Sequence, residues 1–317
     1  MIDRPEVLVV GAGVIGLTCA IALAESGVRV DVVAETVPGR TSSAAGAVWG
    51  PHHVEPKAQV RTWALHSYAV FAELARDPAS GVRMIAGIEA SRTPWAPPDF
   101  TDLLPDLATL TSDLLPDGFA EGVSYTAPLI DAPTYLDFLL ERLRVAGGRI
   151  HTAQIATLAD AAAIAPRVVN ATGIGARTLV PDKELYPIRG QLLVVENPGI
   201  TQWFSEDTGP SPQLTYWFPH GNTLVLGGQA AVGEWSYEPD PTVAQGILDR
   251  CAAIEPAIAN ARILEHRVGL RPTRPSIRLD TESIDKAIIV HCYGHGGGGV
   301  TLSWGVAEHV RSVLLEH

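Results

Sequence analysis

The residues from Glu6 to Glu35 constrain the fold more than any other part of the chain. They read EVLVVGAGVIGLTCAIALAESGVRVDVVAE: an apolar run, a G-x-G-x-x-G turn, a helical stretch ending near Gly27 and a second apolar run. Short apolar runs bounded by glycine turns predict buried strands, and the longer run between them predicts a helix. The segment therefore predicts a β-α-β unit with the glycines in its first turn.

The three glycines of the turn have separate roles in such a unit. Gly11 permits the tight turn, Gly13 lets backbone N–H groups approach a pyrophosphate at the helix N-terminus, and Gly16 lets helix and strand pack closely. Glu35 follows Gly16 by 19 residues, where a carboxylate can accept hydrogen bonds from both hydroxyls of an adenosine ribose. A carboxylate would repel the 2′-phosphate of NADP, so the pattern favours FAD or NAD.

Charge and composition narrow the function classes. A formal net charge of -12 argues against nucleic acids and acidic membranes, which are bound by clustered Lys and Arg. The sequence has no apolar run of 18 residues, so we expect no membrane span. It shows no basic N-terminal leader, and its last residues, LLEH, do not match a peroxisomal tripeptide, so we expect a cytoplasmic protein. The cysteines, Cys19, Cys251 and Cys292, are far apart in the sequence, which predicts neither a disulfide framework nor a metal site.

The remaining chain contains two kinds of segment. RVVNATGIGAR (167–177) repeats the pattern of a buried strand followed by glycines, and residues 300–317 predict a final helix. Residues 94–128 are rich in proline and predict loops, whereas RGQLLVVENPG and TYWFPHGNTLVLGGQA predict antiparallel strands. The chain therefore predicts a mixed α/β (α+β) fold, with a Rossmann-like nucleotide-binding domain interleaved with an antiparallel-sheet domain.

The C-terminal third carries a family resemblance. It contains VGLRPTRPSIRL (268–279) and HCYGHGGGGVTLSWG (291–305), preceded by YWFPHGNTLVLGG (216–228). Together with VLVVGAGVIGLT, TSSAAGAVWGP and PIRGQLLVVE, these motifs occur in the order found in the D-amino-acid oxidase family, which the chain resembles over nearly its whole length. The resemblance implies an FAD-binding domain of residues 1–56, 150–188 and 268–317, and a substrate-binding domain of residues 57–149 and 189–267.

The resemblance also implies an activity. Members of this family bind FAD non-covalently and remove a hydride from the α-carbon of a D-amino acid onto flavin N5. The imino acid hydrolyses to a 2-oxo acid and ammonia, and O2 reoxidises the flavin to give H2O2. By resemblance, Arg271 anchors the substrate carboxylate, Tyr216 donates a second hydrogen bond to it, and the carbonyl of Gly297 accepts from the amine. A guanidinium suits the first role because its planar fork pairs with a carboxylate through two hydrogen bonds.

The cofactor contacts carry over in the same way. The resemblance places the expected FAD-binding residues at the pyrophosphate (Ala12, Gly13, Val14, Ile15), at the ribose (Glu35, Thr36), in a loop over the phosphates and isoalloxazine (Thr41, Ser42, Ala47, Val48), on the adenine side (Ile155, Thr172) and at the flavin beside the last helix (Arg271, Gly296, Gly297, Gly299, Val300, Thr301). Gly298 has no assigned role.

Specificity is less constrained by the sequence. Pro212 stands where family members carry a lid tyrosine, and His52 matches a histidine of D-aspartate oxidases. The stretch Ser205-Glu206-Asp207 offers carboxylates but no arginine, which favours neutral over acidic D-amino acids.

Several alternatives stay open at this point. They are a D-aspartate or D-glutamate oxidase, an oxidase of glycine, sarcosine or proline, a nicotinamide dehydrogenase and a non-catalytic FAD-binding module. The expected partners are a D-amino acid and O2, and the protein is expected to be a monomer or a homodimer.

Overall fold

The computed structural model describes residues 4–51, 54–95, 100–208 and 213–316, so the expectations for His52 and Pro212 lie outside the described residues. The helices are α1 Val14–Ala24, α2 Arg40–Ser43, α3 Lys57–Leu74, α4 Ala132–Val145, α5 Leu158–Ile164, α6 Ala176–Leu179, α7 Pro241–Ile254 and α8 Gly299–Leu315. The strands are β1 Val7–Val10, β2 Val30–Ala34, β3 Val82–Ser91, β4 Ala108–Thr109, β5 Glu121–Ile130, β6 Arg149–Thr152, β7 Arg167–Asn170, β8 Tyr186–Glu196, β9 Trp203–Glu206, β10 Gln213–His220, β11 Thr223–Gln229, β12 Ala231–Val232, β13 Ile263–Ile284 and β14 Ala287–His295.

One half of the molecule is a parallel sheet in the order β14-β7-β1-β2-β6. Alternate residues of β1 face opposite sides, as a strand requires. Val7 and Val9 pack in the core formed with α1 and α8, whereas Leu8 and Val10 pack against α5. Both faces are therefore covered, which explains why the strand is an unbroken apolar run. The β-α-β unit predicted from the opening sequence is confirmed.

The other half is built mainly from antiparallel strands, in the order β8-β11-β10-β9-β3-β5-β4, with β3 and β9 parallel. Helix α7 covers one face through Ala244, Ile247 and Cys251. The loop prediction for residues 94–128 is wrong at its end, because β5 pairs with β3 along Glu121–Ile130. Pro128 is tolerated there because β4 pairs only with Val123 and Ser124; beyond them the proline carbonyl accepts the Trp49 N–H at 2.9 Å, a contact that needs no N–H from the proline itself.

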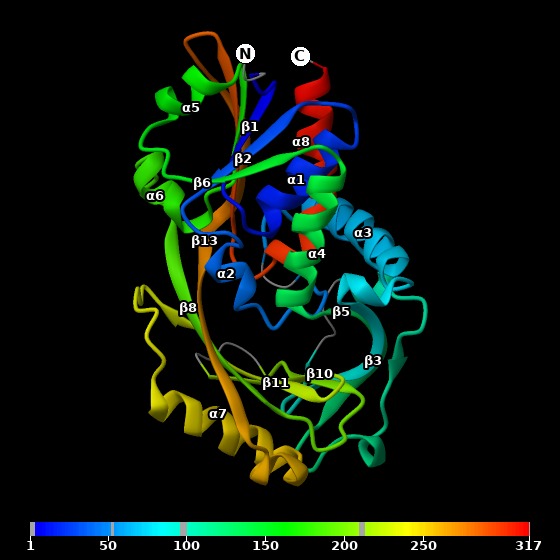
Figure 1. Cartoon of the computed structure of the whole chain (residues 1–317). Helices are drawn as coiled ribbons and strands as arrows, with labels where there is room; N and C mark the ends of the chain where they lie inside the picture. Colours follow the sequence, from blue (N-terminus) through cyan, green and yellow to red (C-terminus); the bar gives the residue numbers. More distant parts are fainter. Residues whose placement is uncertain (1–3, 52–53, 96–99, 209–212, 317) are drawn as a thin grey trace.

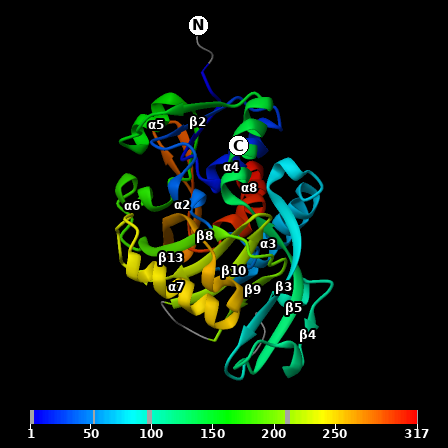
Figure 2. The same ribbon diagram turned by 60° about the horizontal axis from the view of Figure 1, so that its bottom comes forward.

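The long strand β13 joins the halves. β13 pairs with β8 from Ile263 to Thr273 and with β14 from Thr273 to Ile284, so the two halves form one continuous sheet (Figure 1). The turned view shows α7 in front of the antiparallel half, with β3, β4 and β5 extending away from the parallel half (Figure 2). The mixed α/β class is confirmed. The domain limits stay a prediction, and β13 runs through residue 268 without a break.

Two kinds of feature are absent from the described ranges. No helix in them combines the length and apolarity needed to span a membrane. The same residues contain no group of three or more His, Cys, Asp or Glu side chains placed to hold a metal ion.

Candidate cofactor and substrate site

A cavity of about 1020 Å³ lies where the two halves meet. It runs from the carboxyl ends of the parallel strands, past the start of α8, to β9 and β10 of the antiparallel half. Every residue expected in the site lines it: Ala12, Gly13, Val14, Ile15, Glu35, Thr36, Thr41, Ser42, Ala47, Val48, Ile155, Thr172, Tyr216, Arg271, Gly296, Gly297, Gly299, Val300 and Thr301. Residues separated by up to 289 positions in the sequence (301 − 12) are thus brought to one cavity.

Backbone segments meet closely at the N-terminus of α1. Gly13 is the N-cap and has no side-chain capping bond. A Cβ atom on Gly39 would lie 3.0 Å from the Cα atom of Gly13, and one on Gly11 would lie 2.4 Å from the carbonyl oxygen of Ala171. The Ser42 Oγ atom accepts the Val14 N–H at 3.0 Å. The remaining first-turn N–H groups and the positive end of the helix dipole therefore face a cradle formed by glycine backbone and the Ser42 hydroxyl, which fits a pyrophosphate.

The opposite part of the parallel half suits a nucleoside. Glu35 and Thr36 follow the end of β2 and are exposed, and Thr172 follows β7. The hydroxyl of Thr172 donates to Asn170 Oδ1 at 2.7 Å, so Asn170 fixes the loop that carries Thr172. These positions lie at the carboxyl ends of neighbouring parallel strands, where open α/β sheets bind nucleotides.

The glycine run forms the entry to α8. Gly296 has a φ of +54°, a region that side chains disfavour, and Gly298 is the N-cap of the helix. A Cβ atom on Gly298 would lie 2.8 Å from Val54 Cγ2, so this glycine, which the sequence left without a role, is required by packing. The Thr301 hydroxyl accepts the Gly50 N–H at 3.2 Å and donates to the Gly50 carbonyl at 3.3 Å. It therefore fixes the loop that continues from Ala47 and Val48.

Arg271 and Tyr216 define the far end of the cavity. The Arg271 guanidinium lies over Gly190 of the neighbouring strand, and its Nη1 donates to the Gln229 carbonyl at 3.0 Å. The Tyr216 ring lies over Gly227, with which it is paired across the strands. Burial raises the pKa of Tyr216, and the nearby Arg271 charge only partly offsets this. The tyrosine is therefore a neutral hydroxyl beside a fixed cation, a combination suited to binding a carboxylate.

Acidic side chains line the wall beyond Tyr216. In the strand register Glu89 pairs with Ser205, and Ser205 pairs with Tyr216, so the three lie in one row on the same face of the sheet. Glu89 is 2% exposed and accepts a hydrogen bond from the Tyr125 hydroxyl at 2.8 Å. Ser205, Glu206 and Asp207 were expected here from the sequence, whereas Glu89 was missed because β3 itself was not predicted. The apolar residues at alternate positions of this segment, Val82, Met84, Ala86, Ile88 and Ala90, were the available signal.

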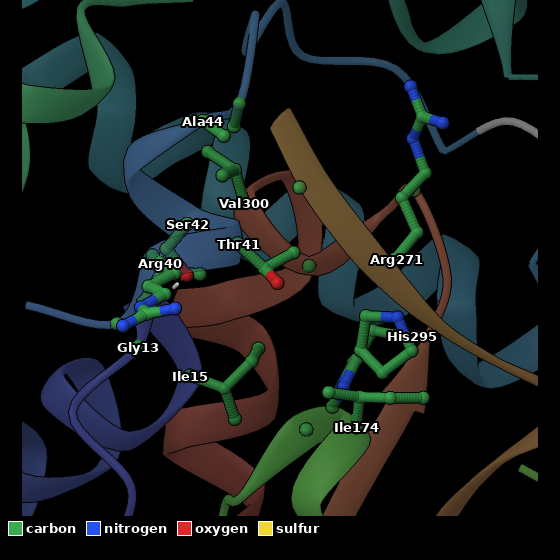
Figure 3. A pocket seen from close by; sticks show the side chains of 18 of the residues that line it. Gly13, Ile15, Arg40, Thr41, Ser42, Ala44, Ile174, Arg271, His295 and Val300 are labelled. Carbon is green, nitrogen blue, oxygen red and sulfur yellow. Dashed lines mark hydrogen bonds between the residues drawn. The ribbon is translucent and has the colours of Figure 1, made fainter. Parts of the chain in front are cut away.

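Three further lining residues were also missed. His295 is 3% exposed, and burial lowers its pKa to about 4, which keeps the imidazole neutral. Arg40 lies next to Gly13 and Ser42, on the opposite side of the view from Arg271 and His295 (Figure 3). Tyr237 comes from the segment before α7. Single residues of this kind carry no local pattern, so only the folded chain brings them to the cavity.

Known proteins resemble this chain over nearly its whole length. The family model described as "FAD dependent oxidoreductase" matches residues 6–312. The chain is 45% identical over 313 residues to a D-amino-acid oxidase of Rubrobacter xylanophilus, covering 96% of this chain and 94% of that protein. It is 46% identical over 311 residues to a D-amino-acid oxidase of Streptomyces coelicolor, with the same coverage of both. It is also 32% identical to human D-aspartate oxidase, over 99% of this chain and 96% of that one.

Solved structures show the same fold at lower identity. Glycine oxidase from Geobacillus kaustophilus has a TM-score of 0.83 at 20% identity, covering 99% of this chain and 95% of that one. The family resemblance seen in the sequence is confirmed, and FAD, which fits the cradle at Gly13, is the cofactor. The chain belongs to the family of FAD-dependent oxidoreductases that includes the D-amino-acid oxidases.

Proposed function

We propose that this protein is an FAD-dependent D-amino-acid oxidase, which converts D-amino acids to 2-oxo acids with release of ammonia and H2O2. The observation that carries the proposal is the convergence of Arg271 and Tyr216 with the glycine entry of α8 in the cavity that holds the dinucleotide cradle. The names of the two relatives at 45% and 46% identity support it.

The proposed roles of the residues follow from their chemistry. Arg271 binds the substrate carboxylate through its guanidinium fork, and Tyr216 donates a second hydrogen bond to the same group. The carbonyl of Gly297 accepts from the substrate amine, which leaves the α-hydrogen directed at the cofactor. FAD, when bound, would supply the hydride acceptor, with O2 as the final oxidant. The protein contributes position and orientation, and the chemistry needs no side chain as a general base.

The wall beyond Tyr216 bears on the choice of substrate. Glu206 is paired with Arg92 at 2.9 Å, and Asp207 accepts from Trp95 Nε1 at 2.9 Å. With Glu89, these residues add carboxylates to the side of the cavity that a substrate side chain would occupy. A second carboxylate on the substrate would be repelled there. We therefore propose neutral D-amino acids as substrates in preference to D-aspartate and D-glutamate.

Two alternative activities are each favoured by one comparison. The identity to human D-aspartate oxidase favours an oxidase of acidic D-amino acids, and the fold shared with glycine oxidases favours an oxidase of glycine or sarcosine. Arg271 could bind the carboxylate that all of these substrates share. The pocket around the substrate side chain therefore decides between them.

Reduction of the bound flavin is the direct test. The purified protein should be yellow, and anaerobic addition of D-alanine, D-valine or D-proline should bleach the flavin band, with H2O2 formed once air is admitted. Reduction by L-enantiomers but not by D-enantiomers would overturn the proposal. Faster reduction by D-aspartate, or by glycine and sarcosine, would instead select one of the runner-up activities.

The remaining expectations rest on the sequence alone. We propose a cytoplasmic location, a role in D-amino acid catabolism and a monomeric or homodimeric state. Cell fractionation and light scattering of the holoenzyme test the first and the last of these.

A further inference from the structure

Arg40 presents a cation to the cofactor end of the cavity. Of the described residues that line the cavity, the Lys and Arg side chains are Arg40 and Arg271. Arg271 donates to a backbone carbonyl, whereas the Arg40 guanidinium has no ion pair or hydrogen bond within the described ranges. In a chain with a net charge of -12, an exposed guanidinium without a carboxylate partner, facing a cavity, marks a place for an anion.

The position of Arg40 identifies that anion. Arg40 directly follows Gly39, the residue that packs on Gly13. Its side chain lies beside Gly13 and Ser42, at the N-terminus of α1 (Figure 3). A phosphate in the cradle would thus meet first-turn N–H groups from one element and a guanidinium from another. Arginine and phosphate form short, charge-assisted hydrogen bonds.

Tyr237 holds the guanidinium from the other side. The Arg40 Cζ atom lies 5.6 Å from the centre of the Tyr237 ring, within the range of a cation-π contact. The segment carrying Tyr237 is fixed at both sides. Arg189 donates to the carbonyls of Ser236 and Glu238, and Gln191 exchanges two hydrogen bonds of 2.8 Å with the backbone of Asp240. Tyr237 is therefore held in a fixed position by the antiparallel half, and its ring contacts the guanidinium of Arg40 from the parallel half.

We propose that Arg40 binds the pyrophosphate of FAD and that Tyr237 holds it in place, so that the two halves clasp the cofactor between them. The proposal concerns cofactor affinity and rests on FAD as the cofactor, not on which amine is oxidised. Failure of D-amino acid oxidation would leave it standing, and its own failure would leave the proposed activity standing.

The test measures FAD released from the holoenzyme on serial dilution, followed by the return of flavin fluorescence, at low and at raised NaCl. Arg40→Gln should raise the Kd for FAD about tenfold, the value of one charge-assisted contact, and should weaken the dependence of Kd on salt. Arg40→Lys should have a Kd for FAD between those of the wild-type protein and Arg40→Gln, because lysine keeps the charge but lacks the planar guanidinium. A Kd for Arg40→Gln within about twofold of the wild-type value would overturn the proposal.

Tyr237 and Arg40 should act as a pair. Tyr237→Leu should raise the Kd in the wild-type protein and have little further effect in the Arg40→Gln background. Equal effects in both backgrounds would show that Tyr237 does not act through Arg40. The matched control is Arg177→Gln: Arg177 stacks on Trp235 of the same segment at 5.8 Å but does not line the cavity. It should keep the wild-type Kd, and a rise equal to that of Arg40→Gln would overturn the phosphate contact.

Competition by nucleotide fragments separates phosphate binding from a general loss of structure. ADP should displace FAD about equally from the Arg40→Gln and wild-type holoenzymes, because both nucleotides lose the same contact, whereas adenosine, which has no phosphate, should displace FAD more effectively from Arg40→Gln. Equal displacement by adenosine from both holoenzymes would contradict a contact to the phosphates.

Discussion

Arg271 can occupy its position only because residue 190 is a glycine. Gly190 pairs with Gly269 across β8 and β13, which places Arg271, two residues further along, diagonally over it on the same face. A Cβ atom on Gly190 would lie 2.7 Å from both Nη atoms of Arg271. The strand register thus aims the guanidinium at the cavity.

We expect Gly190→Ala to displace that guanidinium and to lower kcat/KM for D-alanine by about 100-fold, since a misplacement of about 1 Å can cost this much. FAD content should be unchanged. Steady-state kinetics and the flavin spectrum check both outcomes. Gly246→Ala, in a helix on the other face of the sheet, is the control and should leave kcat/KM unchanged. Wild-type kinetics in Gly190→Ala would argue against the role of Arg271.

The variant Arg271→Lys tests whether the site needs the two parallel hydrogen bonds of a guanidinium. An ammonium cannot form two parallel hydrogen bonds with a carboxylate, so we expect KM for D-alanine to rise by about tenfold or more while FAD stays bound. Substrate titration of flavin reduction measures this. If the variant binds and turns over D-alanine like the wild type, the assignment of the carboxylate anchor is wrong.

At the scale of elements, two adjacent glycines at the start of α8 have different surroundings. A Cβ atom on Gly297 would meet only Arg271 Cδ, at 3.8 Å, whereas one on Gly298 would come within 2.8 Å of Val54 Cγ2. Gly297 is therefore open to the cavity, and Gly298 is closed by packing.

This difference predicts opposite effects of substitution. Gly297→Val should abolish reduction of the flavin by D-alanine with little loss of stability, because its methyl groups enter the cavity. Gly298→Ala should retain reduction but destabilise the protein by about 1–3 kcal/mol, the usual cost of overpacking. Anaerobic reduction and urea unfolding, measured on both variants, distinguish the two cases. Unimpaired reduction in Gly297→Val would exclude a close approach of the substrate.

At the scale of the whole molecule, buried histidines couple stability to pH. Burial lowers the pKa of His220 and of His295 to about 4, and also lowers that of His291. Because the unfolded chain takes up these protons near pH 6.5 and the folded chain does so only near pH 4, stability should be full above pH 6.5 and fall as the pH drops towards 4.

Each unit of pKa difference corresponds to about 1.4 kcal/mol, so His295 alone should account for up to about 3 kcal/mol of this loss. Urea unfolding of the holoenzyme between pH 7 and pH 4 measures it. His295→Gln should give a flatter profile over this range. His309→Gln is the control: His309 is exposed on α8, and its profile should match that of the wild type.

The sequence by itself determined those features that depend on neighbouring residues. The GAGVIG turn and Glu35 specified the dinucleotide cradle, since their roles depend on backbone freedom and spacing within one β-α-β unit. The motifs around Arg271, Tyr216 and Gly297 specified the family, and all three residues line the cavity.

Only the tertiary structure decided which distant residues share the cavity. Glu89 reaches it through the pairing of β3 with β9, Gly190 makes room for a side chain of another strand, and Arg40 meets Tyr237 across the two halves. Strand register and close packing act between segments far apart in the chain, and no local pattern of residues records them. For this reason the sequence identified the cofactor and predicted the carboxylate anchor, while the fold determined what surrounds them.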